Sequence, residues 1–262
     1  VQITKENSPK IYSLLLEACE ILDIQKIPPL YLINSPTVNA YTTCVSNPLI
    51  SITFGAIERL EGQEILFLLG HELGHIKSAH VMYSHMASNF KPILESLGSV
   101  PLGIGKIAGG GFDVALDYWS RMSELSCDRS GLITCQNTKP AIQALIKLGG
   151  ANPNDFVADE LEKSFLKQAK DFDDFDVSAI NKFIKATQTL GLGTHPWLVL
   201  RASQLLKWHS SGEYKDVIDG SNRQVLDQLN IYSNNEFCPN CGAEIFKSDK
   251  YCSGCGVMFA SK

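Results

Sequence analysis

The chain has 262 residues, of which 44% are hydrophobic and 19% are charged, and its formal net charge is −5. A chain of this length and hydrophobic content can bury a sizeable core, which argues against an intrinsically disordered protein. The acidic balance, without any basic block, argues against a protein that binds nucleic acid.

Hydrophobic periodicity predicts a mostly helical chain with a small sheet near its start, which is an α+β fold. The first helix begins at Ser8-Pro9, a typical N-cap and first-turn pair, and ends before Pro28-Pro29. Three short strands are predicted after it, at residues 30–33, 41–46 and 49–54. Further helices are predicted at residues 56–60, 63–86, 113–134, 140–148, 155–169, 175–190 and 196–209.

Residues 96–112 interrupt this helical pattern. They are apolar and contain six glycines, with Lys106 as the only charged side chain. A stretch of 17 residues with so many glycines is short and weak for a membrane span. A buried loop or helical hairpin is one interpretation of this segment. The other is a surface in peripheral contact with a membrane, or the remnant of a membrane insertion.

The sequence His71-Glu72-Leu73-Gly74-His75 lies in an apolar run that is predicted to be helical. Because positions i and i+4 share one helix face, His71 and His75 can present two imidazoles to one zinc ion. Glu72 is placed to take a proton from a zinc-bound water. Two structural core histidines are the alternative, but they do not explain an acidic residue in so apolar a run. The motif therefore predicts a catalytic zinc site.

A catalytic zinc ion usually has three protein ligands, so a further ligand is needed. The pattern with a third histidine ten residues after the first fails, because that position is Val81. On a continuous helix His80 would lie about 180° around from His71. We therefore interpret His80 as structural or surface, and give His85 and His209 the same interpretation.

A carboxylate from a second helix is the better candidate for the third ligand. Glu124 and Asp128 are four residues apart and so share a helix face. Glu124 would bind zinc, and Asp128 would accept a hydrogen bond from the second nitrogen of a ligating histidine. A solvated helix face is the alternative for an isolated pair of this kind. Cys127 is a competing soft ligand, but it lies off the face that Glu124 and Asp128 share.

Together these motifs resemble the HtpX-like zinc metallopeptidases, a gluzincin family that also contains the CAAX prenyl endopeptidases. The resemblance covers roughly residues 10–209. It rests on Asn39-Ala40-Tyr41, on the run from Gly70 to Ile76, on Glu124 with Asp128, and on His195-Pro196 with Arg201. It implies a zincin-like domain, and a zinc-dependent endopeptidase that hydrolyses peptide bonds with a Glu-activated, zinc-bound water.

The resemblance also implies a role for each matching residue. The zinc ligands would be His71, His75 and Glu124, with Glu72 as the general base and Asp128 in support. Asn39 and Tyr41, on the approach to an edge strand, would hold the substrate backbone. His195 would stabilise the oxyanion, with Arg201 supporting it, although a helix cap is the alternative for His195.

Two C-x-x-C pairs near the end of the sequence predict a second metal site. Its four ligands would be Cys238, Cys241, Cys252 and Cys255. Four thiolates at this spacing are typical of a closed, structural zinc ribbon, and a redox dithiol pair is the alternative. Residues 236–262 carry three acidic and three basic side chains, which favours a protein partner over nucleic acid. The expected cofactors are thus two zinc ions, one catalytic and one structural.

The predicted organisation is a metallopeptidase domain at residues 1–209, a linker at 210–235 and the zinc ribbon at 236–262. Many members of the resembled family have membrane helices between the two metal-binding helices, where this chain has only residues 96–112. We therefore expect a cytoplasmic protein with peripheral membrane contact, which acts on polypeptides in protein quality control. A latent or inactive peptidase-fold adaptor or holdase, acting through its ribbon, is the alternative.

Overall fold

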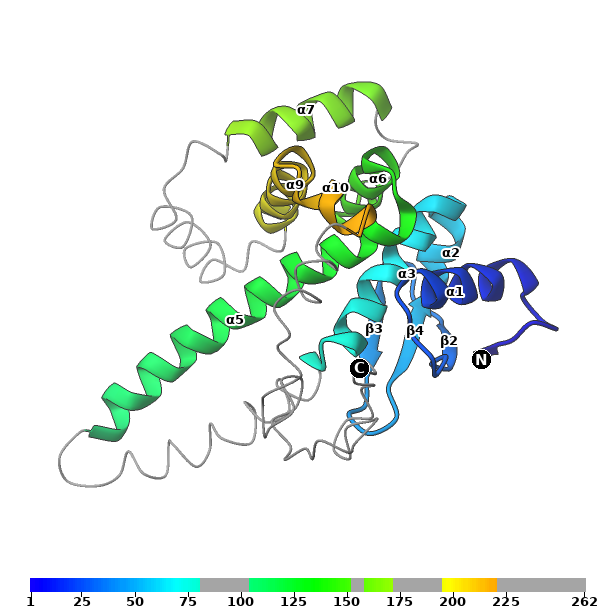
Figure 1. Cartoon of the computed structure of the whole chain (residues 1–262), viewed down its shortest axis with the longest axis horizontal. Coiled ribbons are helices and arrows are strands. Elements are labelled where there is room, and N and C mark those ends of the chain that lie inside the picture. The colour runs from blue at the N-terminus through cyan, green and yellow to red at the C-terminus, as the bar shows by residue number, and fades with distance from the viewer. Residues whose placement is uncertain (81–103, 152–157, 172–194, 221–262) are drawn as a thin grey trace, which may run out of the picture. The chain divides into compact units, whose positions relative to one another are not determined.

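The computed structural model describes residues 1–80, 104–151, 158–171 and 195–220 (Figure 1). The chain divides into two compact units, Val1–Trp208 and His209–Lys262. The first unit contains the sheet and most of the described helices. In the second unit the described residues form the end of α9 and all of α10. The predicted zinc ribbon at 236–262 and the predicted helix at 175–190 lie outside the described residues.

A four-stranded sheet is built by the first part of the chain. Its strands are β1 (Gln2–Ile3), β2 (Leu30–Ile33), β3 (Ala40–Thr43) and β4 (Leu49–Thr53), in the order β1-β2-β4-β3. β2 and β4 are parallel, and the two outer strands pair antiparallel. The three predicted strands are confirmed, whereas β1 is too short to show a pattern in the sequence. β3 lies at one edge of the sheet, so no strand of the described residues pairs with the other side of its backbone.

Helices make up most of the remaining described residues. They are α1 (Pro9–Ile21), α2 (Phe54–Arg59), α3 (Gly62–Lys77), α5 (Ile104–Cys135), α6 (Thr138–Leu148), α7 (Ala158–Asp171), α9 (His195–Ser210) and α10 (Glu213–Ile218). Their presence confirms the expected mostly helical α+β architecture. α10 lies inside the predicted linker, a polar and mixed segment in which we expect some helix.

α3 is the central helix of the first unit, and it packs against α1, α5, α6 and the edge strand β3. Figure 1 shows it in cyan between the sheet and the long green rod of α5. Its first turn is closed by a capping box between Glu61 and Glu64. Glu64 is buried and also forms an ion pair with Lys147 of α6, with Nζ 2.7 Å from Oε2. These contacts hold the start of α3 in place.

The helix predicted at residues 63–86 is interrupted after α3, and residues 81–86 lie outside the described part of the chain. The last helical residue of α3 is Lys77, and Ala79 has a φ of +54°, in the left-handed region. Because residues other than glycine rarely enter this region, periodicity does not signal such a stop. The helical-wheel argument that separated His80 from the zinc face is therefore wrong, since the chain has left the helix before it reaches His80.

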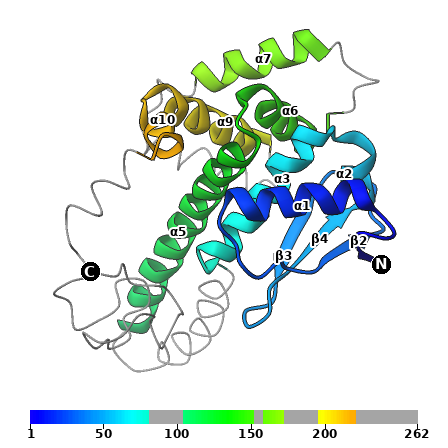
Figure 2. The same cartoon turned by 45° about the vertical axis from the view of Figure 1, so that its right-hand side comes forward.

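α3 packs closely against α5 (Figure 2). The close approach is possible because small residues meet where the two helices cross. A Cβ at Gly131 of α5 would lie 2.7 Å from the carbonyl oxygen of Phe67 in α3. A Cβ at Gly74 of α3 would lie 2.9 Å from the Cβ of Ser130 in α5. Real side chains essentially never approach so closely, so glycine is needed at both positions. The close crossing brings α5 side chains within reach of the histidines of α3.

α5 starts at Ile104, earlier than the predicted Asp113, so part of the glycine-rich segment is helical. Residues 96–103 lie outside the described part of the chain. Among the described residues, no helix combines the length and the apolar character that crossing a membrane requires.

Candidate metal centre

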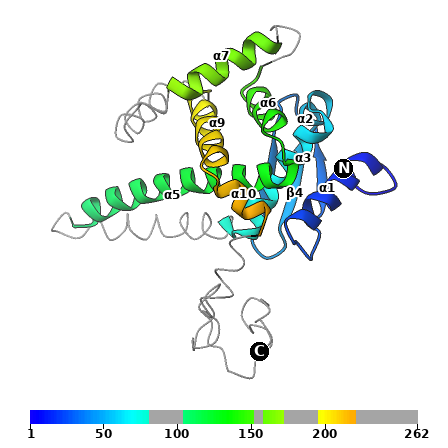
Figure 3. The ribbon, with the colours of Figure 1, turned by 45° about the horizontal axis from the view of Figure 1, so that its top comes forward.

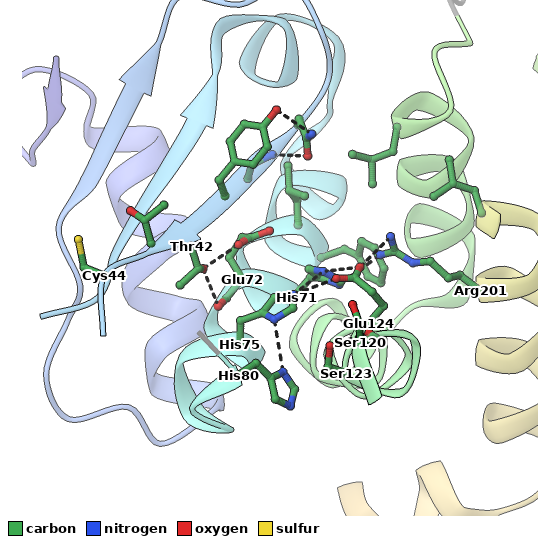
Figure 4. Close-up of a pocket in the computed structure, with 18 residues that line it drawn as sticks. Thr42, Cys44, His71, Glu72, His75, His80, Ser120, Ser123, Glu124 and Arg201 are labelled. Carbon is green, nitrogen blue, oxygen red and sulfur yellow. Dashed lines mark hydrogen bonds and ion pairs between the residues drawn. The ribbon is translucent and has the colours of Figure 1, made fainter. Parts of the chain in front are cut away.

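A cleft of about 610 Å³ lies between the edge strand β3 and the helices α3, α5 and α9. Figure 4 shows its lining, with Thr42 on the strand side, His71, Glu72 and His75 from α3, and Glu124 from α5. The segment from Asn39 to Cys44 forms one wall. The cleft therefore joins the predicted metal ligands to the strand expected to hold substrate.

Three donor atoms meet at the floor of this cleft. Nε2 of His71 lies 3.3 Å from Nε2 of His75 and 3.5 Å from Oε2 of Glu124. Nε2 of His75 lies 3.4 Å from Oε1 of Glu124. Donors held 2.0–2.1 Å from a tetrahedral zinc ion are separated by about 3.3–3.4 Å. Two imidazoles and a carboxylate at these separations fit a zinc ion and leave one position open.

The orientation of His71 is fixed by a buried chain of polar groups. Its Nδ1 lies 2.9 Å from Oδ1 of Asp128, so this nitrogen carries the proton and donates to the carboxylate. The other ring nitrogen, Nε2, is then free to bind a metal ion. Arg201 of α9 donates to both oxygens of Asp128, at 2.6 and 2.7 Å, and its Nη1 lies 3.1 Å from Oε2 of Glu124. Figure 3 shows α9 lying across α5. From α9, Arg201 reaches both of these carboxylates.

Burial and charge work against each other in this cluster. Burial alone would raise the pKa of Asp128, but the Arg201 guanidinium and the hydrogen bonds hold that pKa below its ordinary value. Burial would lower the pKa of His71, but hydrogen bonds to Asp128 and Glu124 outweigh it and raise the pKa to about 9. In the metal-free protein both ring nitrogens of His71 therefore carry a proton at neutral pH. A zinc ion must displace the proton on Nε2 in order to bind.

Glu72 faces the cleft beside the three donor atoms (Figure 4). The hydroxyl of Thr42 lies 2.7 Å from Oε2 of Glu72 and 3.0 Å from its carbonyl oxygen, so it can donate to either. The residue is almost fully buried, and a buried carboxylate needs such a donor. Sequence reasoning missed Thr42, because no local pattern marks a strand residue that will meet a helix 30 residues later.

His80 also reaches the cluster, although we interpret it from the sequence as structural or surface. Its Nδ1 lies 3.3 Å from Nδ1 of His75 and 3.4 Å from Sγ of Cys127. Burial, followed by charge at His75, lowers the pKa of His80 to about 4, so the ring is neutral. Burial likewise raises the pKa of Cys127, which is therefore a thiol in the metal-free protein.

The remaining site residues from the sequence fall into two groups. Asn39 and Tyr41 line the cleft, and Nδ2 of Asn39 donates to the hydroxyl of Tyr41 at 3.0 Å. His195 is the first residue of α9, but its side chain lies outside the described residues. The same holds for the four ribbon cysteines, Cys238, Cys241, Cys252 and Cys255.

Residues 5–209 match the model of peptidase family M48. The chain is 35% identical over 232 residues to the plastoglobule-localized metallopeptidase 48 of Arabidopsis thaliana, an alignment that covers 87% of this chain and 65% of that protein. It is 29% identical over 189 residues to the HtpX homolog protease of Helicobacter pylori, covering 63% of this chain and 60% of the relative. For the HtpX protease of Legionella pneumophila the identity is 28% over 162 residues, covering 52% of this chain and 56% of the relative.

The chain thus spans less than two thirds of the length of each of these relatives. No solved structure matches it. The family match extends over most of the chain and includes the whole cluster of His71, His75, Glu124, Asp128 and Arg201. The chain therefore belongs to peptidase family M48, as an HtpX-like metallopeptidase.

Proposed function

We propose that this chain is a zinc-dependent endopeptidase that hydrolyses peptide bonds in polypeptides. The observation that carries the proposal is the convergence of three donor atoms, from His71, His75 and Glu124, beside the carboxylate of Glu72. When bound there, zinc would supply a Lewis acid that polarises the scissile carbonyl and acidifies the attacking water. The other chemical roles fall to side chains of the chain itself.

Glu72 is the proposed general base. Its carboxylate takes a proton from the attacking water as the new C–O bond forms, and then passes it to the leaving amine as the C–N bond breaks. The hydrogen bond from Thr42 directs one oxygen of this carboxylate and leaves the other to accept the proton. His195, at the start of the helix that carries Arg201, is proposed to stabilise the oxyanion.

The edge strand β3 is the proposed substrate-binding element. It pairs with β4 on one side, and residues 40–43 line the cleft. An extended peptide can add to such an edge through backbone hydrogen bonds, which favours backbone recognition over side-chain sequence. Asn39 and Tyr41 are proposed to assist there, and the exposed ring of Tyr41 is available to a peptide. This mode suits unfolded polypeptides, the substrate class expected for protein quality control.

Residues 1–209 are proposed to form the peptidase domain, joined through 210–235 to a ribbon at 236–262. Cys238, Cys241, Cys252 and Cys255 would hold a second, structural zinc ion in that ribbon. The proposal rests on the spacing of the cysteines in the sequence. The ribbon would recruit a protein partner or substrate, because its balanced charge does not favour nucleic acid.

Cleavage of casein, an unfolded protein, tests the function. The wild-type chain is compared with Glu72→Gln, a variant of nearly the same shape, at equal zinc content. We expect cleavage by the wild type and its loss in the variant. Equal cleavage by both proteins would remove Glu72 from the mechanism. Binding of casein without cleavage by either would favour the adaptor or holdase alternative.

A further inference from the structure

The second histidine of the cluster has a proton that needs an acceptor. Nε2 of His75 faces His71 and Glu124, so Nε2 is the nitrogen that would bind zinc. A neutral imidazole has one N–H, and that proton must then sit on Nδ1. Ligating histidines almost always donate this second N–H to a partner, which fixes the ring and its tautomer. For His71 the partner is Asp128.

The group that lies against Nδ1 of His75 is the ring of His80. The two Nδ1 atoms are 3.3 Å apart, and a dashed line joins them in Figure 4. A neutral His80 with its proton on Nε2 presents a lone pair at Nδ1, which accepts from His75. The His80 ring is held in turn by an edge-on contact with Trp119, with ring centroids 5.6 Å apart.

The chain departs from helical geometry to make this contact. On a continuous helix, His80 would point about 140° away from His75, because each residue turns the helix by 100°. Instead α3 ends at Lys77, and the left-handed Ala79 turns the backbone so that His80 returns to the cleft. Such backbone strain persists only where surrounding contacts hold it in place.

We propose that His80 is a positioning residue for the metal site, which holds Nδ1–H of His75 as Asp128 holds that of His71. The proposal rests on the zinc site of the proposed function. It assigns the two ligands different partners, a charged carboxylate for His71 and a neutral imidazole for His75. Loss of such a partner typically weakens metal binding by roughly 10–100-fold.

The test measures the zinc dissociation constant of the full-length chain by competition with a chelator. Three variants are compared with the wild type: His80→Asn, His80→Gln and His80→Leu. An asparagine amide oxygen lies at the same bond separation from Cβ as Nδ1, whereas the glutamine oxygen lies one atom further out. We expect His80→Leu and His80→Gln to weaken zinc binding by roughly 10–100-fold, and His80→Asn to restore most of it. His71→Ala should bind one zinc ion fewer than the wild type. The affinity of that missing ion is the one to compare among the His80 variants.

Cadmium NMR provides the second measurement, because sites with nitrogen and oxygen ligands give signals apart from those of thiolate sites. The cluster signal should stay in the nitrogen and oxygen range in the wild type and in Cys127→Ser. Wild-type affinity in all three His80 variants would overturn the proposal, and so would an Asn variant as weak as the Leu variant. A thiolate-shifted signal that Cys127→Ser abolishes would instead make His80 and Cys127 metal ligands.

These outcomes can be told apart from failure of the proposed function. Tight zinc binding at His71 without any cleavage of casein would refute the peptidase while leaving the role of His80 intact. If cleavage depends on Glu72 but the His80 variants bind zinc as tightly as the wild type, the role of His80 is refuted and the peptidase function stands.

Discussion

Arg201 of α9 holds Asp128 of α5 with two hydrogen bonds, from Nε to Oδ2 at 2.7 Å and from Nη2 to Oδ1 at 2.6 Å. Both side chains are buried, and Oδ1 of Asp128 also accepts from His71 of α3. One carboxylate therefore links three helices whose residues are far apart in the sequence. This connection orients the ring of His71, a proposed zinc ligand on α3.

The first prediction concerns the Arg201–Asp128 pair. Arg201→Met leaves the buried carboxylate of Asp128 with His71 as its remaining charged partner. Breaking a buried pair in this way costs up to about 3–5 kcal/mol. We expect a loss of this size in the free energy of unfolding of the zinc-free protein, measured by urea denaturation. Lys163→Met is the control, because the pair of Lys163 with Glu160 is exposed and should contribute little. Equal effects of the two substitutions would contradict the role given to Arg201.

The second prediction concerns pH. The folded protein raises the pKa of His71 from its ordinary 6.5 to about 9. The protonated state thus stabilises the zinc-free fold fully below pH 6.5, and this contribution is lost as the pH rises through 9. Unfolding free energies at pH 6.5 and 9.5 should differ by at most about 3 kcal/mol from this group. His71→Gln should flatten the dependence, and an equally steep dependence in that variant would refute the assignment.

Zinc binding should follow the opposite trend over the same pH range. Because the metal displaces the proton of His71, the affinity of the site should rise as the pH increases from 6.5 to 9. Calorimetry of zinc binding near pH 7 in buffers of different ionisation enthalpy should reveal the released proton. A binding enthalpy that is the same in all buffers would contradict the release of this proton.

The third prediction concerns the crossing of α3 and α5. In Gly131→Ala the new methyl group must push against the backbone of Phe67. Overpacking of this kind costs about 1–3 kcal/mol, against a gain in helix propensity of about 1 kcal/mol. We expect lower stability and also weaker zinc binding, because Glu124 and Asp128 move away from α3. Gly62→Ala is the matched control, since a Cβ there meets nothing within 4 Å. Its stability should stay the same or rise by up to about 1 kcal/mol, and its zinc binding should stay unchanged.

The fourth prediction concerns Thr42. Thr42→Val keeps the shape of the side chain but removes the hydroxyl that lies 2.7 Å from the Glu72 carboxylate. A hydrogen bond to a charged group contributes about 1.5–3 kcal/mol, so kcat/KM should fall by roughly tenfold or more while the zinc content is unchanged. Thr42→Ser, which keeps the hydroxyl, is the control and should retain most of the activity. A matching loss in that variant would remove the specific role of the hydroxyl.

The proposed metal-binding face of α3 is readable from the sequence because a helix repeats every 3.6 residues. Spacing alone places His71 and His75 together, and the same argument pairs Glu124 with Asp128. Local periodicity also predicts three of the four strands and most of the described helices. These features depend on neighbours along the chain, which a sequence displays directly.

Tertiary structure decided which partners the site residues meet. Arg201 reaches Asp128 across 73 residues and Thr42 reaches Glu72 across 30, through packing that no local pattern encodes. His80 meets His75 because α3 stops at Lys77 and Ala79 adopts a left-handed conformation. That conformation has a small intrinsic cost, so local propensity does not favour it. It persists in the folded protein because surrounding contacts hold the turn, such as those of His80 with His75 and Trp119.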